Sequence, residues 1–191
     1  METGIVKNII YFEQVGKHNT EETFKIVKIR ADELKINTIL VASTYGETGV
    51  KAVKFFKGYK VVVVSHVCGS REPNVQEMKT ENIEEIRANG GILLTTGHAF
   101  AGIDRAIRNK LNTYEVSEIV AYTLRIFCQG IKVSAEIAMM AADAGLVRTD
   151  EEIIVIAGTS EGADTAVVLK PENSHRFFDM VIKEIICKPR L

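Results

Sequence analysis

Four segments of this sequence combine glycine with serine or threonine, and each follows an apolar run. The segments are STYGETG (43–49), SHVCGSREP (65–73), TTGHAFAG (95–102) and GTSEGADT (158–165). Glycine permits backbone conformations with positive φ and lets a bound molecule approach the main-chain amides. Hydroxyl groups donate hydrogen bonds without carrying charge. This pattern favours the binding of a small polar molecule, and no pair of carboxylates or activated nucleophile stands out beside it.

The segment 43–49 leads into an amphipathic stretch, so its last residues are expected at the N-terminus of a helix. The free amides and the positive end of the dipole at such a position favour an anion, and phosphate is the natural one. The segment is neither a Walker A loop nor a Gly-x-Gly-x-x-Gly fingerprint. The alternative is a tight turn in which Gly46 and Gly49 serve only geometry. Glu47 opposes an anion if its side chain points inward.

His66 and His98 each follow an apolar run closely. Either could donate a hydrogen bond to a bound molecule or act as a general base near neutral pH. The competing interpretation is a loop histidine bonded to the backbone, which we favour for His66. His98 lies in a glycine-flanked loop and is retained as the candidate catalytic residue.

Cys68 lies two residues after His66, and a nearby imidazolium would favour its thiolate. The alternative, a small buried side chain, is the commoner role of cysteine. A metal site built from His66, Cys68 and His98 lacks a fourth ligand and a recognisable spacing, so none is expected. Separately, three arginines could reach a second anionic group of a ligand, with solvated charges as the alternative: Arg71, Arg105 and Arg108.

Apolar runs alternate with helical patterns along the whole chain. We expect strands at 8–12, 38–43, 60–66, 92–97, 153–158, 165–171 and 180–189, the last with a helix as the alternative. We expect helices at 20–35, at 50–57, from Thr80 to the NGG sequence at 89–91, and over 104–145 with breaks near Asn112 and Gly130. The alternation predicts one α/β domain over residues 1–191, with three layers, a mostly parallel sheet and a helical elaboration at 104–145. In such a sheet ligands bind at the carboxyl ends of the strands, where the four segments would meet.

Local signals suggest where these helices begin and end. Asn19 and Glu22 have the spacing of a capping box, and Thr80 is a candidate N-cap. The NGG sequence at 89–91 is typical of a left-handed helix C-cap. Ala135, Ala138 and Ala142 fall on one side of the last helix, where a neighbour could approach closely.

The composition is that of an ordinary globular chain. The 191 residues are 46% hydrophobic and 26% charged, with a net charge of -1, so no general attraction to nucleic acid or to anionic membranes is expected. The apolar run near the start is interrupted by Lys7 and Asn8, and no run is long enough to span a membrane. Cys68, Cys128 and Cys187 form no Cys-x-x-Cys pair, which favours free thiols and a cytoplasmic location. Faces rich in alanine and methionine suit either a homo-oligomer or internal packing.

Two parts of the chain resemble the C-terminal α/β domain of pyruvate kinases: TILVASTYGETGVKAVKFFKGYKVVVVSH (38–66) and IIVIAGTSEGADTAVVLKP (153–171). In pyruvate kinases the loops of these two parts hold an allosteric sugar phosphate. The resemblance implies phosphate contacts from Ser43, Thr44, Gly46 and Thr48 in the first loop, and from Gly162, Asp164 and Thr165 in the second. Tyr45 and Glu47 depart from the family pattern. The tryptophan and arginine that grip a second phosphate have no counterpart, so a single phosphate is expected.

The whole chain resembles a small family of standalone archaeal and bacterial proteins related to that domain. They have no established activity, and members of known structure bind flavin mononucleotide (FMN). The resemblance implies strand order 3-2-1-4-5 with an antiparallel last strand, plus extra helices. It implies FMN as the cofactor, with contacts from Ser43, Thr44, Gly46, Glu47, Thr48, Gly49, Thr95, Thr96, Gly97, His98, Gly158, Thr159, Ser160, Gly162, Asp164 and Thr165. Tyr45 or Phe100 could stack on a flavin ring, with ordinary packing as the alternative.

The expected function is therefore binding of a phosphorylated small molecule, FMN above others, at the carboxyl ends of the parallel strands. One role for such a protein is that of a flavin-dependent oxidoreductase. The alternative is a regulatory module that senses a sugar phosphate or a nucleotide. A third reading is an interaction protein in which flavin is incidental or absent. The lack of an evident nucleophile or carboxylate pair favours binding over catalysis.

Overall fold

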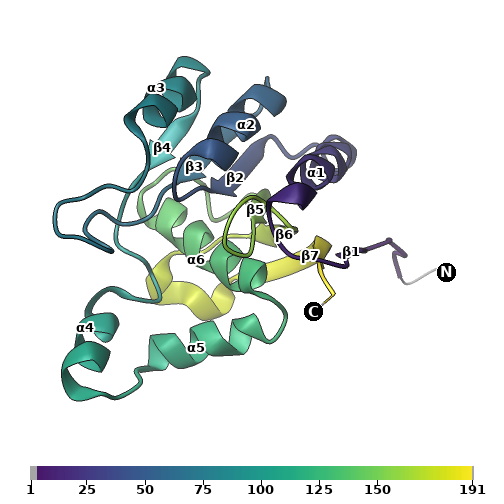
Figure 1. The fold of residues 1–191 in the computed structure, drawn as a ribbon. Helices are drawn as coiled ribbons and strands as arrows, with labels where there is room; N and C mark the ends of the chain where they lie inside the picture. Colours follow the sequence, from purple (N-terminus) through teal and green to yellow (C-terminus); the bar gives the residue numbers. More distant parts are fainter. Residues whose placement is uncertain (1–3, 191) are drawn as a thin grey trace.

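The computed structural model describes residues 4–190 as a seven-stranded sheet with helices on both faces (Figure 1). The strands are β1 (Ile10–Phe12), β2 (Thr38–Ala42), β3 (Lys60–Val64), β4 (Ile92–Leu94), β5 (Ile153–Ala157), β6 (Thr165–Lys170) and β7 (Val181–Pro189). The α-helices are α1 (Thr20–Leu34), α2 (Glu47–Phe55), α3 (Thr80–Ala88), α4 (Gly102–Leu111), α5 (Val116–Arg125) and α6 (Gln129–Asp143). Two 3-10 turns, Lys17–Asn19 and Ser174–Asp179, complete the order.

The sheet has the order β1-β7-β6-β5-β2-β3-β4. Strands β2 to β5 are mutually parallel, whereas β6 runs antiparallel to both β5 and β7. The order 3-2-1-4-5 with an antiparallel last strand is confirmed as β4-β3-β2-β5-β6. Strand β7, which could also have been a helix, is a strand and extends the sheet beyond β6, with β1 pairing parallel to it at the edge.

The two faces of the sheet are buried against different helices. Along β2, Ile39 and Val41 pack into a core with α1, α2 and α3, while Leu40 points to the opposite face and packs against α6. This period of two lets both faces of one apolar strand be buried, as expected of parallel strands covered on both sides. Figure 1 shows α1, α2 and α3 together on one side, and α5 lying beyond α6 on the other.

Helix α6 is the most deeply placed helix of the second layer, with Ala138 and Ala141 fully buried. Its outer side packs with Ala121 of α5 through Ala135 and Met139. The alanine-rich side therefore serves internal packing, one of the two roles that its composition suited. Within residues 4–190, no helix is at once long enough and apolar enough to cross a membrane.

The element boundaries differ from expectation mainly at the carboxyl ends of the strands. Strands β2, β3 and β4 end at Ala42, Val64 and Leu94, so the hydroxyl residues that follow belong to loops. Helix α2 begins at Glu47, three residues earlier than expected, because Gly46 already turns the chain with φ of 98°. In the helical stretch, the break at Asn112 is confirmed, but the second break precedes Gly130, which lies in the first turn of α6.

Two predicted helix caps differ from the structure. Asn19 is the N-cap residue of α1 as predicted, but its side chain forms no capping hydrogen bond, and its amide donates to the carbonyl of Gln14 at 2.7 Å instead. The N-cap of α3 is Lys79 rather than Thr80, and its side chain forms no capping hydrogen bond. The glycine end of α3 is confirmed, since Gly90 has φ of 77° and the Gly91 amide donates to the carbonyl of Ile86.

The close approach of α6 to β6 generates a stability prediction. A Cβ added at Gly130 would lie 2.1 Å from Oγ1 of Thr165. We expect Gly130→Ala to lower the free energy of unfolding by about 1–3 kcal/mol, as overpacking typically does. Urea denaturation followed by circular dichroism measures this. Gly97→Ala is the control, because nothing lies within 4 Å of its added Cβ; equal stability of the two variants would contradict the predicted packing.

Candidate functional site

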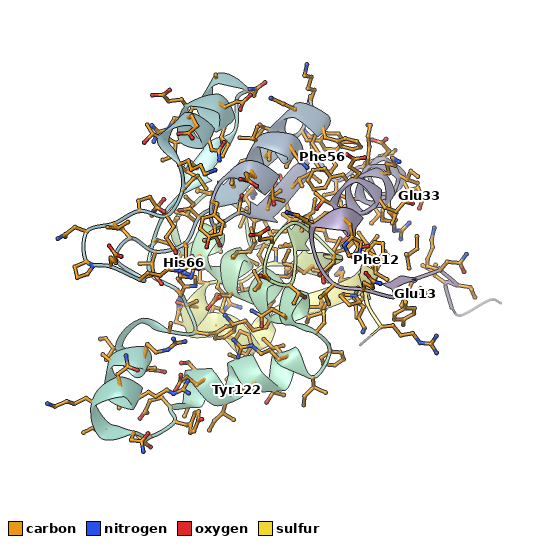
Figure 2. The ribbon with its side chains drawn as sticks, viewed as in Figure 1. Phe12, Glu13, Glu33, Phe56, His66 and Tyr122 are labelled. Carbon is orange, nitrogen blue, oxygen red and sulfur yellow. The ribbon has the colours of Figure 1, made fainter. Side chains whose placement is uncertain are left out.

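The carboxyl ends of β2 to β5 open onto a cavity of about 700 Å³. Its wall comes from the loops after these strands and from α4, α5 and α6. The loops supply mainly hydroxyls, amides and two histidines, whereas the helices supply charged side chains and an apolar area of Val133, Ile137 and Met140. Figure 2 shows His66 in the loop after β3 and Tyr122 on α5, both of which belong to the wall.

All four predicted segments contribute residues to the cavity wall, and three of them carry the residues that were assigned to a cofactor. Those in its wall are Ser43, Thr44, Glu47, Thr48, Gly97, His98, Gly158, Ser160 and Gly162. The other predicted residues are not part of the wall: Gly46, Gly49, Thr95, Thr96, Thr159, Asp164 and Thr165. The Thr95 hydroxyl pairs with that of Ser65 at 2.5 Å, and Thr96 lines a smaller cavity of about 240 Å³.

The β2–α2 loop is held in shape from two sides. The Ser43 hydroxyl oxygen accepts a hydrogen bond from the Gly49 amide at 3.0 Å. From α3, the Asn82 amide donates to the carbonyl of Tyr45 at 2.8 Å. Gly46 has a left-handed conformation, and an added Cβ would lie 2.4 Å from that of Asn82, so only glycine fits. The loop therefore delivers the first turn of α2 to the cavity in a fixed orientation.

The side chain of Glu47 lies in the exposed part of the cavity wall. It is largely exposed, and its carboxylate pairs with Lys79 at 3.4 Å. Thr48 is buried and Thr44 half-buried, and both belong to the cavity wall. Glu47 would oppose a bound anion if its side chain pointed inward. Its charge lies at the rim of the cavity, so this condition is not met.

The β5–β6 loop is organised by Asp164, which is fully buried. Its carboxylate accepts hydrogen bonds from the amides of Gly16 and Thr159 and from the Thr165 hydroxyl. Gly158 is required because an added Cβ would lie 2.5 Å from the carbonyl oxygen of Gly162. Asp164 and Thr165 thus hold the loop from behind, while Gly158, Ser160 and Gly162 face the cavity.

Both ring nitrogens of His98 contact neighbouring residues. Its Nε2 accepts the amide hydrogen of Val67 at 3.3 Å, and its Nδ1 lies 3.4 Å from Glu136 Oε2. The backbone-bonded interpretation therefore describes His98. His66 is different, because its Nδ1 lies 3.0 Å from Glu77 Oε2 and its ring meets that of His98 edge to face at 4.4 Å.

Sequence reasoning missed a buried ion pair on α6. Lys132 and Glu136 contact one another through Nζ and Oε2, and the other carboxylate oxygen of Glu136 accepts the amide of Phe100 at 3.2 Å. Burial alone raises the pKa of Glu136, but the contact with His98 and the charge of Lys132 outweigh it and lower that pKa to about 2. Burial lowers the pKa of Lys132, against the opposing effect of Glu136. The signal was a Lys and a Glu four residues apart inside an otherwise apolar helix.

The predicted arginines have protein partners. Arg108 and Arg105 lie 2.9 and 3.7 Å from the buried carboxylate of Glu118 on α5. Arg71 lies 2.7 Å from Glu77 Oε1, and its guanidinium carbon is 5.6 Å from the centre of the Tyr45 ring. Arg105 and Arg108 line the cavity, whereas Arg71 does not. Arg71 and Arg105 remain mostly exposed, as the alternative of solvated charges expects.

The aromatic and sulfur-bearing candidates also have defined surroundings. Phe100 is buried against Phe177 with ring centres 5.6 Å apart, which is the ordinary packing that was its alternative. Cys68 is exposed at the cavity wall, so the alternative of a small buried side chain is wrong for it; Cys128 and Cys187 are buried. In residues 4–190, no group of three or more His, Cys, Asp or Glu side chains is arranged to hold a metal ion.

The ion pair on α6 generates a second prediction. Glu136→Gln leaves the Lys132 charge buried without its partner, so we expect a loss of about 3–5 kcal/mol of unfolding free energy at neutral pH. The control is Glu151→Gln, whose carboxylate is mostly exposed beside Arg148. Because the Glu136 pKa is lowered on folding, its contribution is present above the ordinary value of 4.5 and is lost as pH falls toward about 2. Denaturation of both variants between pH 4.5 and about 2 measures this. The unfolding free energy should show that pH-dependent loss in the control and not in Glu136→Gln.

Comparisons with known proteins bear on the fold. Two solved structures are similar at 18% identity: O-ureido-L-serine synthase, with a TM-score of 0.31, and a lysine-to-alanine mutant of an O-ureido-L-serine synthase with O-ureido-L-serine bound, with a TM-score of 0.32. The matches cover 50% and 68% of this chain but only 30% and 48% of those chains, and nothing about fold or function follows from them. Residues 21–169, most of the chain, match the family model of the pyruvate kinase alpha/beta domain. This protein therefore belongs to the pyruvate kinase alpha/beta domain family.

Proposed function

We propose that this protein binds a phosphorylated small molecule, FMN above others, in the cavity at the carboxyl ends of β2 to β5. The observation that carries the proposal is the β2–α2 loop, in which left-handed Gly46 starts a helix whose first turn faces the cavity. Amides at a helix N-terminus bind an anionic group through hydrogen bonds and the helix dipole. Membership of the pyruvate kinase alpha/beta domain family supports the same location.

The phosphate end of the site is built from neutral donors. The Thr44 and Thr48 side chains lie in the wall beside the first amides of α2. The Ser43 hydroxyl oxygen accepts a hydrogen bond from the Gly49 amide, so the hydroxyl hydrogen remains available to donate to a phosphate. The carboxylate of Glu47 is held outward by Lys79. A phosphate bound here would be neutralised by hydrogen bonds and a helix dipole rather than by a basic side chain of the loop.

The remainder of the cavity suits a larger, partly apolar group. Its volume of about 700 Å³ falls within the roughly 300–1,000 Å³ that is usual for small-molecule sites. Val133, Ile137 and Met140 provide an apolar area, while Gly97 and Gly158 leave main-chain groups accessible. When bound, a flavin supplies the redox chemistry, and the residues of the wall bind it, orient it and limit access of water. We propose that this takes place in the cytoplasm, which free thiols favour.

The second candidate is a regulatory module that senses a sugar phosphate or another nucleotide. The charged helical side of the cavity favours it, because Arg105, Arg108, Arg125 and Lys132 from α4, α5 and α6 would suit a hydroxyl-rich or anionic ligand. Both candidates share the phosphate position and differ in what fills the rest of the cavity.

Identification of the ligand tests the proposal directly. We expect purified protein to be yellow and to release a molecule with the mass of FMN on denaturation. Protein stripped of ligand should bind FMN more tightly than riboflavin, which lacks the phosphate, in isothermal titration calorimetry. Colourless protein that binds sugar phosphates and not FMN would establish the second candidate instead. Bleaching of the colour by a reduced nicotinamide cofactor, with recovery on adding an electron acceptor, would identify a redox enzyme.

Substitution of Thr48 tests the phosphate position. Thr48→Ala should weaken FMN binding by about 1–2 kcal/mol, the loss of one hydrogen bond to a charged group. Thr48→Glu should abolish binding through charge repulsion. Thr113→Glu, in an exposed loop between α4 and α5, is the matched control and should bind as the wild type does. Circular dichroism checks that each variant is folded, and unchanged affinity in both Thr48 variants would place the phosphate elsewhere.

A further inference from the structure

Two histidines meet at the carboxyl ends of β3 and β4, and each has its own buried glutamate. His66 Nδ1 lies 3.0 Å from Glu77, and His98 Nδ1 lies 3.4 Å from Glu136. The two glutamate side chains are only 6% and 3% exposed. The four groups come from two different loops and from α6, so this arrangement arises only in the folded chain.

The contacts of His98 leave neither of its nitrogens free. Because Nε2 accepts the amide hydrogen of Val67, it carries no proton. The proton of the neutral ring is then on Nδ1, facing the carboxylate of Glu136. His98 is therefore a fixed, neutral ring whose role is to position what packs against it.

The two ring nitrogens of His66 have different surroundings: Nδ1 is buried beside a carboxylate, and Nε2 is not buried. The buried Nδ1 lies at ion-pair distance from Glu77, although the contact does not have hydrogen-bond geometry, and Glu77 is the only acidic group paired with it among residues 4–190. A carboxylate at 3.0 Å favours the proton on Nδ1, and Arg71 holds the other oxygen of that carboxylate at 2.7 Å. Within the described residues Nε2 has no hydrogen-bond partner and is not among the buried atoms, and His66 belongs to the cavity wall. The lone pair of Nε2 is thus available to a bound molecule.

Burial of the His66 ring favours its neutral form. Burial lowers its pKa from the ordinary value of 6.5, and the charge of Arg71 acts in the same direction. The carboxylates of Glu77 and Glu136 oppose them without reversing the result. Gln76 fixes the position of the residue by donating to the His66 carbonyl at 3.2 Å. At neutral pH the ring is therefore neutral, and its unprotonated Nε2 is an acceptor.

We propose that His66 Nε2 is the proton acceptor of this cavity, taking a proton from an N–H or O–H group of the bound molecule. In this step the ligand's N–H or O–H bond breaks, an N–H bond forms at Nε2, and the bonding electrons stay on the ligand atom. The imidazolium is then paired with Glu77, in the arrangement of a general base with its orienting carboxylate. The ligand class is a molecule with a polarised N–H or O–H, such as an imide or an enol. This inference rests on the proposed function for the location of the ligand and replaces His98 with His66.

Reactivity toward diethylpyrocarbonate tests which histidine has the free nitrogen. With the full-length protein and peptide mass spectrometry, we expect His66 to be modified and His98 to react about tenfold more slowly, the cost of breaking one hydrogen bond. Exposed His175 serves as the internal reference. The rate at His66 should reach half its maximum below pH 6.5, the ordinary value for histidine. Equal reactivity of His66 and His98 would overturn the proposal.

Nitrogen-15 NMR tests the orienting role of Glu77. In the wild type, long-range correlations should show His66 with its proton on Nδ1. Glu77→Gln should move that proton toward Nε2 and lower the His66 pKa further, whereas Glu72→Gln, an exposed neighbour, should change neither. A wild-type ring protonated on Nε2 would overturn the proposal even if Glu77→Gln were too unstable to study.

Addition of FMN separates this inference from the proposed function. If both hold, FMN should protect His66 from diethylpyrocarbonate and leave His175 unprotected. If FMN fails to bind at all, the proposed ligand is wrong. The reactivity toward diethylpyrocarbonate and the tautomer seen by NMR still test the role of His66 in that case. If FMN binds and His66 reacts as fast as before, the ligand stands and the role of His66 is overturned.

Discussion

The buried carboxylate of Glu136 is the interaction on which the geometry of the cavity depends. It joins α6, through Lys132, to the β4–α4 loop, through the amide of Phe100 and the ring of His98. A carboxylate removed from water is tolerated only when several partners compensate its lost hydration. Because all of these partners face the cavity side of α6, a displacement of this helix would break several contacts together. The loop, the histidine pair and the helical wall are thus held in one arrangement.

The fold could be predicted from the sequence because its signals are local. Val61 to Val64 and Ile153 to Ile156 are β-branched runs that only buried strands accommodate, and glycines mark the turns between them. The same locality allowed the β2–α2 loop to be recognised, since Gly46 and the amphipathic turn after it are adjacent in sequence. Strand order followed from the resemblance to the pyruvate kinase domain, and the structure has that order.

The parts of the site that escaped prediction depend on partners distant in sequence. His98 was chosen over His66 because its loop has flanking glycines, but Glu136 and Val67 decide its state, and both come from other segments. Outside the site, Asn19 matched a capping pattern, but its side-chain amide bonds instead to the carbonyl of Gln14, five residues earlier. Polar side chains with several available partners adopt whichever contact the tertiary structure offers, which spacing alone does not show. The ion pair of Lys132 with Glu136 is the exception, since its helical spacing was visible beforehand.

The antiparallel direction of β6 makes the two ends of the cavity unequal. After β2 the chain enters a helix, so that side has a concentrated positive pole; after β5 it returns directly as a strand, through a loop fastened from behind by Asp164. The β5 end of the cavity therefore offers no second binding position equivalent to the helix N-terminus for an anionic group. The topology of the sheet therefore makes the cavity electrostatically asymmetric. A molecule with one anionic end would bind in a single orientation, with that end toward α2.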